Sequence, residues 1–293
     1  MIISQLFGGL GNQMFQYAAG RALAIARKTS LKLDVSRLFS ESHHQGFQLP
    51  DIFRGDFDIA TSSDVVNTIG PLRSYPKFQY FLSKQIARRL RGSNYIVEPC
   101  YQYWAGLRAV PTQSFLSGYW QSERYFSDIA TLIREDFTFK IPLTDLNAEI
   151  ADRISSGNSV SLHVRRGDYV SSQAAAAHHG LCSISYYQNA IGALLHKVGP
   201  AIVYIFSDDP KWVRENLMVK EPCVYVDHNQ GPASYIDMQL MSMCKHHIIA
   251  NSSFSWWGAW LNPDHSKTVV APKKWFAKTI PTHDLLPANW IRI

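Results

Sequence analysis

The residues most able to do chemistry lie in HVRRGDYV, at positions 163–170, directly after a predicted apolar strand. Because side chains alternate along a strand, we expect His163 and Arg165 on one face, with Arg166 opposite or in the turn. Paired guanidinium groups beside a glycine suit a phosphate or diphosphate, whose oxygens they bind in bidentate fashion. A surface ion-pair cluster around Asp168 is the structural alternative.

A glycine-rich loop, GGLGNQM at positions 8–14, follows a short apolar strand near the N-terminus. Gly9 and Gly11 match the first two glycines of a dinucleotide-binding fingerprint, but Met14 is too bulky for its third position. The glycines favour close approach of the backbone to a ligand, with the helix N-terminus facing an anion or a sugar. Asn12 then presents an amide to that ligand, or serves as a turn or cap residue.

Two further turns with polar residues follow predicted strands. In YIFSDDP, Asp209 precedes Pro210 and is predicted to cap a helix, which leaves Asp208 freer to face a ligand. In IIANSSFSWWGAWLN, Ser252 and Ser253 lie where helix-start N–H groups and hydroxyls can hold phosphate or cap the helix. No histidine or further carboxylate is close to the acidic pair in sequence, so we expect no metal ion.

The helix predicted in YIDMQLMSMC begins near Asp237. This carboxylate could accept N–H bonds from a guanine edge, or it could complement the helix dipole. Trp256, Trp257 and Trp260 recur at helical spacing and are predicted to lie in the core rather than to form a ligand platform.

Composition indicates an ordinary globular protein, with 46% hydrophobic and 18% charged residues over 293 positions. The net charge of +6 favours an anionic partner, and without a zinc finger, an RRM signature or a basic tail we do not expect nucleic acid. The four cysteines form no CxxC pair, and no signal peptide or apolar run of roughly 20 residues is visible, so we expect a cytoplasmic protein.

The stretch Lys77–Arg91, KFQYFLSKQIARRLR, predicts a basic amphipathic helix. Such a helix can lie on anionic lipid at the inner face of a membrane, or pack on the core with a solvated charged face. The sequence therefore allows two interpretations of this helix, peripheral contact with a membrane and packing on the core of the protein.

The order of predicted elements indicates two α/β domains. A strand, the glycine loop, a helix and a second strand open the chain, and regular β/α alternation restarts after residue 145. We therefore predict domains at 1–145 and 146–293, each with a parallel, doubly wound sheet, with the last residues of the chain packing back on the first domain. Ligand sites are expected outside the carboxyl ends of the strands.

Taken together, four motifs resemble those of the bacterial-type inverting α-1,2-fucosyltransferases. The motifs are GGLGNQMFQYA at 8–18, HVRRGDY at 163–169, FSDD at 206–209 and NSSFSWWGAWL at 251–261. The resemblance implies a GT-B fold, with two facing Rossmann-like domains and a cleft between them. It also implies transfer of L-fucose from GDP-β-L-fucose to the 2-hydroxyl of a terminal galactose, with inversion and without metal.

The resemblance also implies roles for single residues. Arg165 would hold the β-phosphate of the departing GDP, and Arg166 would support the diphosphate or the fold around it. The other donor-side positions would be His163 and Asp237 by the guanosine, Ser252 and Ser253 by the phosphates, and Gly9, Gly11 and Asn12 from the first domain. From its place in the acidic turn, Asp208 is a further donor-binding candidate. The acceptor would be a galactose-terminated oligosaccharide, lipid-linked if the basic helix contacts membrane.

The catalytic base stays open at this stage. Asp168 could take the proton of the acceptor hydroxyl or only orient the arginines, and His163 is a second candidate. Because glycosyl transfer proceeds with oxocarbenium character, a reaction driven by the leaving group could also need little or no base.

Three other functions compete with this one. A nicotinamide oxidoreductase would use the glycine loop, with Asp34 as the ribose-binding acid. A non-catalytic carbohydrate-binding protein would use the many tyrosines and tryptophans, but it leaves HVRRGD without a purpose. A different sugar-nucleotide transferase on the same fold is the alternative within the enzyme class.

Overall fold

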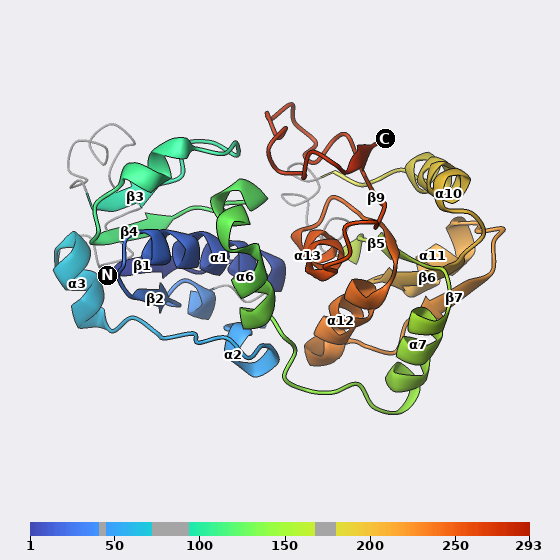
Figure 1. Ribbon diagram of the computed structural model, residues 1–293, viewed down its shortest axis with the longest axis horizontal. Helices are drawn as coiled ribbons and strands as arrows, with labels where there is room; N and C mark the ends of the chain where they lie inside the picture. The colour runs from blue at the N-terminus through green and yellow to red at the C-terminus, as the bar shows by residue number, and fades with distance from the viewer. Residues whose placement is uncertain (41–44, 72–93, 168–179) are drawn as a thin grey trace. The chain divides into compact units, whose positions relative to one another are not determined.

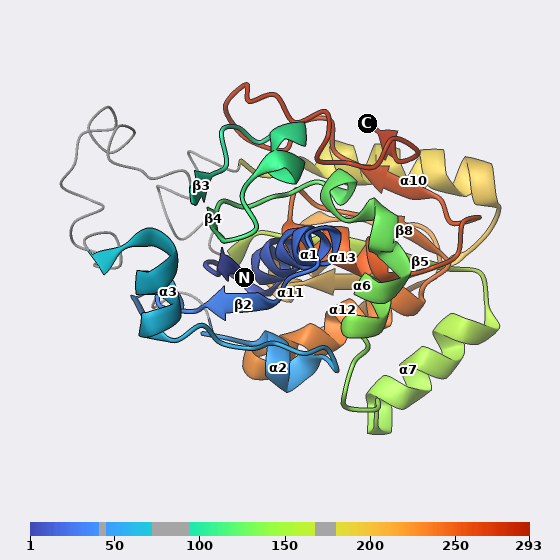
Figure 2. The ribbon, with the colours of Figure 1, turned by 60° about the vertical axis from the view of Figure 1, so that its left-hand side comes forward.

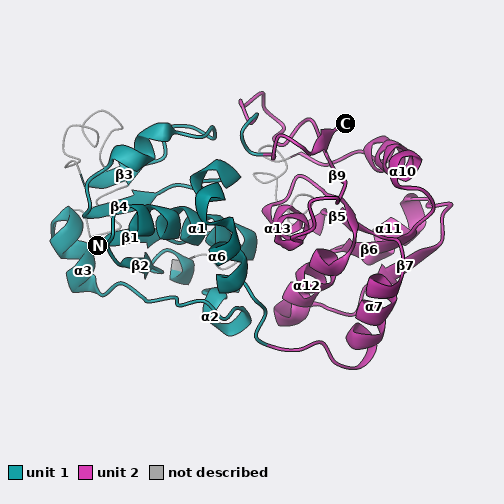
Figure 3. Cartoon of the chain, in the orientation of Figure 1, with its two compact units in different colours: residues 1–140, 283–285 teal, residues 141–282, 286–293 magenta. Residues whose placement is uncertain are grey.

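The computed structural model describes residues 1–40, 45–71, 94–167 and 180–293. They form two compact units, Met1–Lys140 with His283–Leu285 (unit 1) and Ile141–Thr282 with Leu286–Ile293 (unit 2), as Figure 3 shows. The predicted Lys77–Arg91 helix and the candidate base Asp168 lie outside the described residues.

Unit 1 is built on a parallel sheet with strand order β2–β1–β4–β3 (Figure 1). Its strands are β1 (Ile2–Gln5), β2 (Leu31–Asp34), β3 (Tyr95–Val97) and β4 (Ser114–Ser117). Its α-helices are α1 (Leu10–Ala26), α2 (Leu49–Ile52), α3 (Ser62–Ile69) and α6 (Ala130–Asp136). The predictions for β1, α1 and β2 are confirmed, whereas β3 and β4 lie in a region that the sequence analysis left without regular structure.

Helices α1 and α3 lie on either side of these strands (Figure 2). On the α1 side, the Ser4 hydroxyl donates to the Gln16 carbonyl at 2.8 Å. On the α3 side, Ile3 packs with Ile69 and Phe115. Strands β2 and β4 lie on opposite sides of β1, so the strand order of the sheet reverses between β1 and β4. In sheets of this kind, ligands bind beyond the carboxyl ends of the strands at the point of reversal.

Unit 2 contains a larger parallel sheet with strand order β10–β9–β8–β5–β6–β7. Its strands are β5 (Ser159–Val164), β6 (Ile202–Ser207), β7 (Cys223–Val226), β8 (His246–Ile248), β9 (Val269–Ala271) and β10 (Ile291–Arg292). Its α-helices are α7 (Asp145–Ser156), α10 (Ile184–Val198), α11 (Pro210–Asn216), α12 (Tyr235–Met243) and α13 (Ser253–Leu261). The β/α alternation predicted after residue 145 is therefore confirmed, and β10 is an addition that the sequence did not predict.

Numbered from β5 onward, the strands of unit 2 follow the order 3-2-1-4-5-6, which is that of a dinucleotide-binding doubly wound sheet. Alternation along β5 separates its two faces. Val160, Leu162 and Val164 pack with residues of α10 and α11 in one hydrophobic cluster. Ser161 and His163 point to the other face, where Ser161 contacts His247 and His163 contacts Phe254 of α13.

The predicted tryptophan core is confirmed. Trp256, Trp257 and Trp260 are buried, and their rings pack with one another at centroid distances of 5.0–6.0 Å. They anchor α13, and this fixes the turn between β8 and α13 at the carboxyl edge of the sheet. No helix in the described parts of the chain is both long enough and apolar enough to cross a membrane.

Candidate functional site

In unit 2 the strand order reverses between β5 and β8, so a ligand is expected beyond the ends of these two neighbouring strands. Strand β5 ends at Val164, and Arg165 follows immediately. Strand β8 leads to Asn251, Ser252 and the first turn of α13. The HVRRGD and NSSFSWW motifs therefore share one edge of one sheet.

The side chain of Arg165 is held by Asp208, which follows β6. Guanidinium Nη1 lies 2.9 Å from Asp208 Oδ2, with side-chain exposures of 30% and 23%. The other oxygen of Asp208 accepts the backbone N–H of Arg166 at 2.8 Å. A Cβ at Gly167 would lie 2.6 Å from Asp208 Oδ2, so the glycine of HVRRGD leaves room for this carboxylate. Asp208 thus fixes both the turn and the arginine.

Arg166 points toward a different partner. Its Nε donates to Asp209 Oδ2 at 3.2 Å, and its guanidinium carbon lies 3.6 Å from the centroid of the Trp212 ring. Asp209 also caps α11 by accepting the N–H of Trp212, with Pro210 at the first helical position, so the predicted cap is confirmed. Of its two expected roles, these contacts favour support of the fold around the diphosphate.

His163 is only 4% exposed, and its Nδ1 has no hydrogen-bond partner among the described residues. Burial, reinforced by the nearby charge of Arg165, lowers the pKa of the imidazole to about 3. The ring is therefore neutral near pH 7. In that state one nitrogen donates and the other accepts, and the ring is a weak proton acceptor.

Around the β8–α13 turn, Ser252 caps α13, and its hydroxyl accepts the N–H of Phe254 at 3.3 Å. Ser253, half-buried, begins the helix. Asn251 serves the turn itself, because its amide donates to the carbonyls of Gly180 and Trp275 at 3.2 and 3.1 Å. A helix N-terminus can bind an anion through N–H groups of its first turn, and in α13 the N–H of Phe254 is bonded to Ser252.

Asp237 belongs to a buried amide network. It is 8% exposed, and its Oδ1 accepts from Asn229 at 2.9 Å. Asn229 in turn exchanges hydrogen bonds with Asn147 of α7 at 2.9 and 3.0 Å. Burial raises the pKa of the Asp237 carboxyl to about 7. A carboxyl of this kind takes up or releases a proton easily when a ligand offers a hydrogen bond.

In unit 1 the glycine loop is short. Gly8 has a φ of +77°, Gly9 caps α1, and Gly11 and Asn12 lie in the first turn of that helix. Asn12 Oδ1 accepts from Gln121 Nε2 at 2.9 Å, which ties the loop to the segment after β4. A Cβ at Gly8 would lie 2.7 Å from Asn12 Nδ2. Asn12 is therefore positioned by the loop and by Gln121.

Two buried glutamines explain the rest of the first motif. Gln13 donates to the Gly8 carbonyl at 3.1 Å, and Gln16 pairs with both the N–H and the carbonyl of Phe7. Asp34 is bound to Gln5 at 3.1 Å and to the N–H of Ser36 at 3.1 Å, with 8% exposure. The Asp34 carboxylate therefore makes hydrogen bonds inside unit 1 and is nearly inaccessible to a ligand. This argues against an oxidoreductase in which Asp34 binds the ribose.

Sequence reasoning missed a carboxylate in unit 1. Glu98 follows β3 and accepts the backbone N–H groups of Tyr119 (2.7 Å) and Trp120 (3.0 Å), which follow β4. Burial raises its pKa to about 7, against the opposing effect of these two hydrogen bonds. The sequence does contain a pattern that could have identified Glu98, because this carboxylate directly follows a short apolar run. Asp208 follows an apolar run in a similar way.

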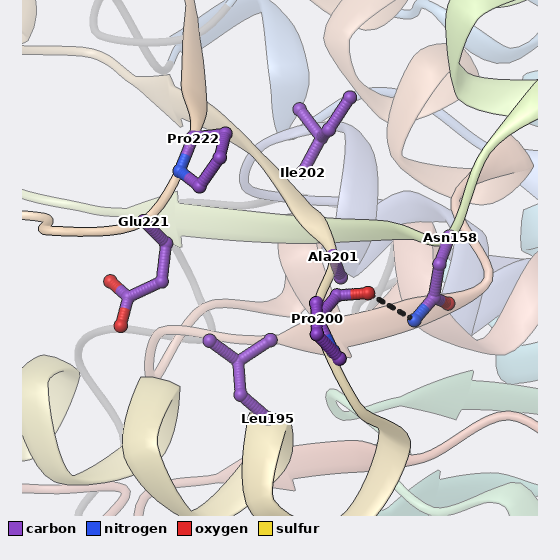
Figure 4. Close-up of a pocket in the computed structure, with 7 residues that line it drawn as sticks. All are labelled: Asn158, Leu195, Pro200, Ala201, Ile202, Glu221 and Pro222. Atoms are coloured by element: carbon purple, nitrogen blue, oxygen red, sulfur yellow. Dashed lines mark hydrogen bonds between the residues drawn. The ribbon is translucent and has the colours of Figure 1, made fainter.

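The described residues contain no group of three or more potential metal-ligating side chains. A shallow, mostly apolar pocket lies at the opposite, amino edge of the sheet in unit 2, beside Asn158, Ile202 and Pro222 (Figure 4). None of the candidate site residues lines it. Among the described residues of unit 2, the candidates Arg165, Asp208, Ser252 and Ser253 lie at the carboxyl edge instead.

Comparison with known proteins agrees with these observations. The model of Glycosyl transferase family 11 matches residues 4–293. An "Alpha-1,2-colitosyltransferase" from Escherichia coli is 35% identical over 100% of this chain and 99% of its own length. The "O-antigen biosynthesis glycosyltransferase WbnK" from the same species is 37% identical, with 94% of each chain covered. A "Galactoside 2-alpha-L-fucosyltransferase" from Caenorhabditis elegans is 29% identical over 57% of this chain and 48% of its own length.

Among solved structures, the "NodZ alpha-1,6-fucosyltransferase soaked with GDP-fucose" is similar with a TM-score of 0.53 and 17% identity, covering 89% of this chain and 92% of that one. The resemblance that the four motifs carried is confirmed, and so is an α/β fold of the GT-B type with two parallel-sheet units.

Proposed function

The chain belongs to Glycosyl transferase family 11, and from that premise we propose that it transfers L-fucose from GDP-β-L-fucose to the 2-hydroxyl of a terminal β-galactoside, with inversion. The observation that carries the proposal is the location of Arg165, which follows β5 at the switch point of a dinucleotide-type sheet and is held in place by Asp208. A nucleoside diphosphate is the ligand that such an edge binds best.

In the proposed reaction the bond between fucose and the β-phosphate breaks while the acceptor oxygen bonds to the anomeric carbon. Negative charge then grows on the leaving diphosphate. A preorganised guanidinium binds that charge more strongly in the transition state than in the ground state. Because Asp208 already fixes Arg165, little reorganisation is needed when the charge develops. No step of this scheme requires a metal ion.

Other residues of both units receive donor-binding roles in this proposal. Asp237 and the neutral imidazole of His163 contact the guanosine, and Ser252 and Ser253 contact the phosphates with the first turn of α13. Arg166 holds α11 through Asp209 and Trp212 and supports the edge indirectly. Gly9, Gly11 and Asn12 are proposed to contact the donor from unit 1.

The pKa of about 3 at His163 argues against this residue as the base, because its conjugate acid would be too strong to hold the acceptor proton. Asp168 stays the candidate for that role. An Asp168→Asn variant should retain affinity for GDP and lose transfer if the carboxylate takes the proton. Unchanged transfer would support a reaction driven by the leaving group.

The proposed function is tested by transfer of labelled fucose from GDP-fucose to lactose with EDTA present. We expect transfer by the wild type and a loss of about a hundred- to thousandfold for Arg165→Ala. Arg153→Ala, which removes an exposed arginine of the same unit, is the matched control. If the wild type transfers no fucose to lactose or any other β-galactoside and binds no GDP, the proposal is wrong. If EDTA abolishes transfer and a divalent cation restores it, the reaction requires a metal ion. That result would contradict the predicted metal independence but not the proposed transfer.

A second donor is favoured by one specific comparison. The relative that matches the whole chain at 35% identity is named as a colitosyltransferase. Colitose differs from fucose by the absence of one ring hydroxyl, and a site that hydrogen-bonds this hydroxyl discriminates strongly against the sugar that lacks it. GDP-fucose and GDP-colitose should therefore be compared as donors at equal concentration, and the ratio of their kcat/KM values decides between them.

The natural acceptor is proposed to be a galactose-terminated oligosaccharide, lipid-linked at the cytoplasmic face of a membrane. The support for the lipid link is the composition of Lys77–Arg91. Binding to vesicles that contain anionic lipid, with loss of binding when Arg88, Arg89 and Arg91 are neutralised, would support it. Equal binding by wild type and variant would end it.

A further inference from the structure

We propose that Glu98, Tyr101 and Tyr119 form a binding subsite for a sugar ring of the acceptor oligosaccharide on unit 1. The inference rests on the proposed function, because it assigns the acceptor side of that reaction to named residues. None of the four motifs includes these three residues. The pairing of β3 with β4 brings them together.

The location of the subsite is the first argument. Glu98 follows β3, Tyr119 follows β4, and the backbone N–H of Glu98 donates to the Ser117 carbonyl at 3.0 Å. All three belong to the carboxyl edge of the sheet, next to the point where the strand order reverses. Beyond Tyr119 the chain reaches Gln121, which bonds Asn12 of the glycine loop at 2.9 Å. The new subsite and the first sequence motif are therefore joined within one unit.

The carboxylate of Glu98 is held in one orientation by two backbone hydrogen bonds. Oε2 of Glu98 accepts from the N–H of Tyr119, and Oε1 accepts from the N–H of Trp120. A carboxylate oxygen accepts two hydrogen bonds, so each oxygen keeps capacity for a sugar hydroxyl. A Cβ at Gly118 would lie 2.4 Å from the Glu98 Cβ, so the glycine is needed for this approach.

The third argument is the aromatic surface beside the carboxylate. The rings of Tyr101 and Tyr119 are nearly parallel, with centroids 6.0 Å apart and an interplanar angle of 20°. The Phe7 ring makes a T-shaped contact with the Tyr119 ring, with ring centroids 4.9 Å apart. Both tyrosines are half-buried, so part of each side chain reaches solvent. An aromatic face beside one fixed hydrogen-bond acceptor is the combination that small polar ligands with an apolar side require.

The fourth argument is backbone strain at the same turn. Trp120 has a φ of +55° and a fully buried side chain. A bulky residue in the left-handed region is unfavourable and persists only where the surroundings impose it, often at ligand-binding sites. Here Glu98 accepts the consecutive backbone N–H groups of Tyr119 and Trp120, and these two bonds hold the turn. The strained turn holds the Tyr119 ring in its orientation.

The test uses the full-length protein with lactose as the probe. Lactose binding is followed by saturation-transfer NMR with GDP present, and lactose KM is measured in the transfer assay. We expect Tyr101→Ala and Glu98→Gln to raise the KM for lactose at least tenfold and to abolish the NMR signal. GDP affinity and the slow release of fucose from GDP-fucose to water should stay within about twofold of wild type.

Two control variants separate binding from stability. Tyr95→Ala removes a tyrosine of β3, whose ring stacks on Phe115 at 5.4 Å beside the hydrophobic cluster of unit 1. Asp136→Asn removes a carboxylate that holds Tyr17 and Arg21 within unit 1. Both should lower thermal stability and leave the lactose KM of the folded protein unchanged.

The outcomes distinguish this inference from the proposed function. If folded Tyr101→Ala and Glu98→Gln keep the lactose KM and the NMR signal, the subsite is wrong although the transferase activity stands. If GDP affinity falls in parallel with lactose binding, the residues act on the fold of the unit and the inference is also wrong. Failure of the proposed function would appear in the wild type, as absence of both transfer and fucose release. Lactose binding by NMR would still test the subsite.

Discussion

Arg165 and Asp208 form an ion pair of 2.9 Å between the residue that follows β5 and a residue that follows β6. The same carboxylate accepts the backbone N–H of Arg166. Asp208 was predicted to be a donor-binding residue. In the structure it contacts Arg165 and the backbone of Arg166, and from these contacts we predict that it also positions the Arg165 guanidinium.

Replacing Asp208 with Asn should lower kcat for fucosyl transfer by roughly ten- to hundredfold, because a loosely held guanidinium stabilises the leaving diphosphate less well. The amide can still accept the Arg166 N–H, so the turn should stay folded. Steady-state kinetics with GDP-fucose check this, and a small change in donor KM beside a large change in kcat is expected. Asp208→Glu should restore part of the rate. Equal losses from Asp208→Asn and Asp208→Glu would contradict a role in holding Arg165.

Arg166→Ala should affect stability more than donor binding. The guanidinium stacks on Trp212 and pairs with Asp209, and such partly exposed contacts are worth roughly 1 kcal/mol of the free energy of unfolding. Chemical denaturation and GDP titration of the same variant give the two quantities. A loss of GDP affinity as large as that of Arg165→Ala would show that Arg166 contacts the diphosphate instead.

Gly8→Ala should reduce both stability and transfer. Its φ of +77° is costly for alanine, by roughly 1–2 kcal/mol, and the new methyl group would displace the Asn12 amide. Gly70→Ala is the matched control, because Gly70 also has a positive φ, +84°, but open space around it. Thermal unfolding should show a loss for both variants, and the transfer assay a large loss for Gly8→Ala alone. Normal activity of folded Gly8→Ala would mean that the position of Asn12 is unimportant.

Acceptor binding should depend on pH through Glu98. Because the pKa of this carboxyl is raised to about 7, it loses its charge as the pH falls from 8 to 6, and the KM for lactose should rise by up to about tenfold. The titratable groups that face it are Tyr101, Tyr119 and Tyr125. Burial raises the pKa of Tyr101 to about 12 and that of Tyr125 further, so these two stay neutral over this range. A Glu98→Gln variant should show a flat profile, and an unchanged pH dependence in that variant would assign the titration to another group.

Folding stability should fall in acid because of His163. Its pKa is lowered to about 3 in the folded protein, so between pH 3 and about 6.5 only the unfolded chain binds the proton. The free energy of unfolding therefore rises with pH across this window and is insensitive to His163 above it. Denaturation of wild type and His163→Gln at several pH values measures the contribution, and the variant should show the shallower acid dependence. Identical slopes for the two proteins would mean that folding does not lower the pKa of this imidazole.

The sequence by itself determined the regular elements of unit 2, the core position of the tryptophans and the family. Strong β/α alternation and four motifs carry that information locally, in short stretches such as HVRRGD and NSSFSWW. Strands β3, β4 and β10 were missed. Strands β8 and β9 are equally short but were found through the β/α alternation around them, whereas β3 and β4 lie in an aromatic-rich stretch where no such alternation stands out.

Tertiary structure alone decided which partner each polar side chain takes. Arg165 and Arg166 are neighbours in sequence, yet one pairs with Asp208 and the other stacks on Trp212, because the end of β5 meets the end of β6. Asp34 turned inward to Gln5, and Glu98 met Tyr119 through the pairing of β3 with β4. The physical reason is that hydrophobic periodicity specifies an element and its buried face, whereas side-chain contacts depend on strand order and register, which pairing between distant segments sets.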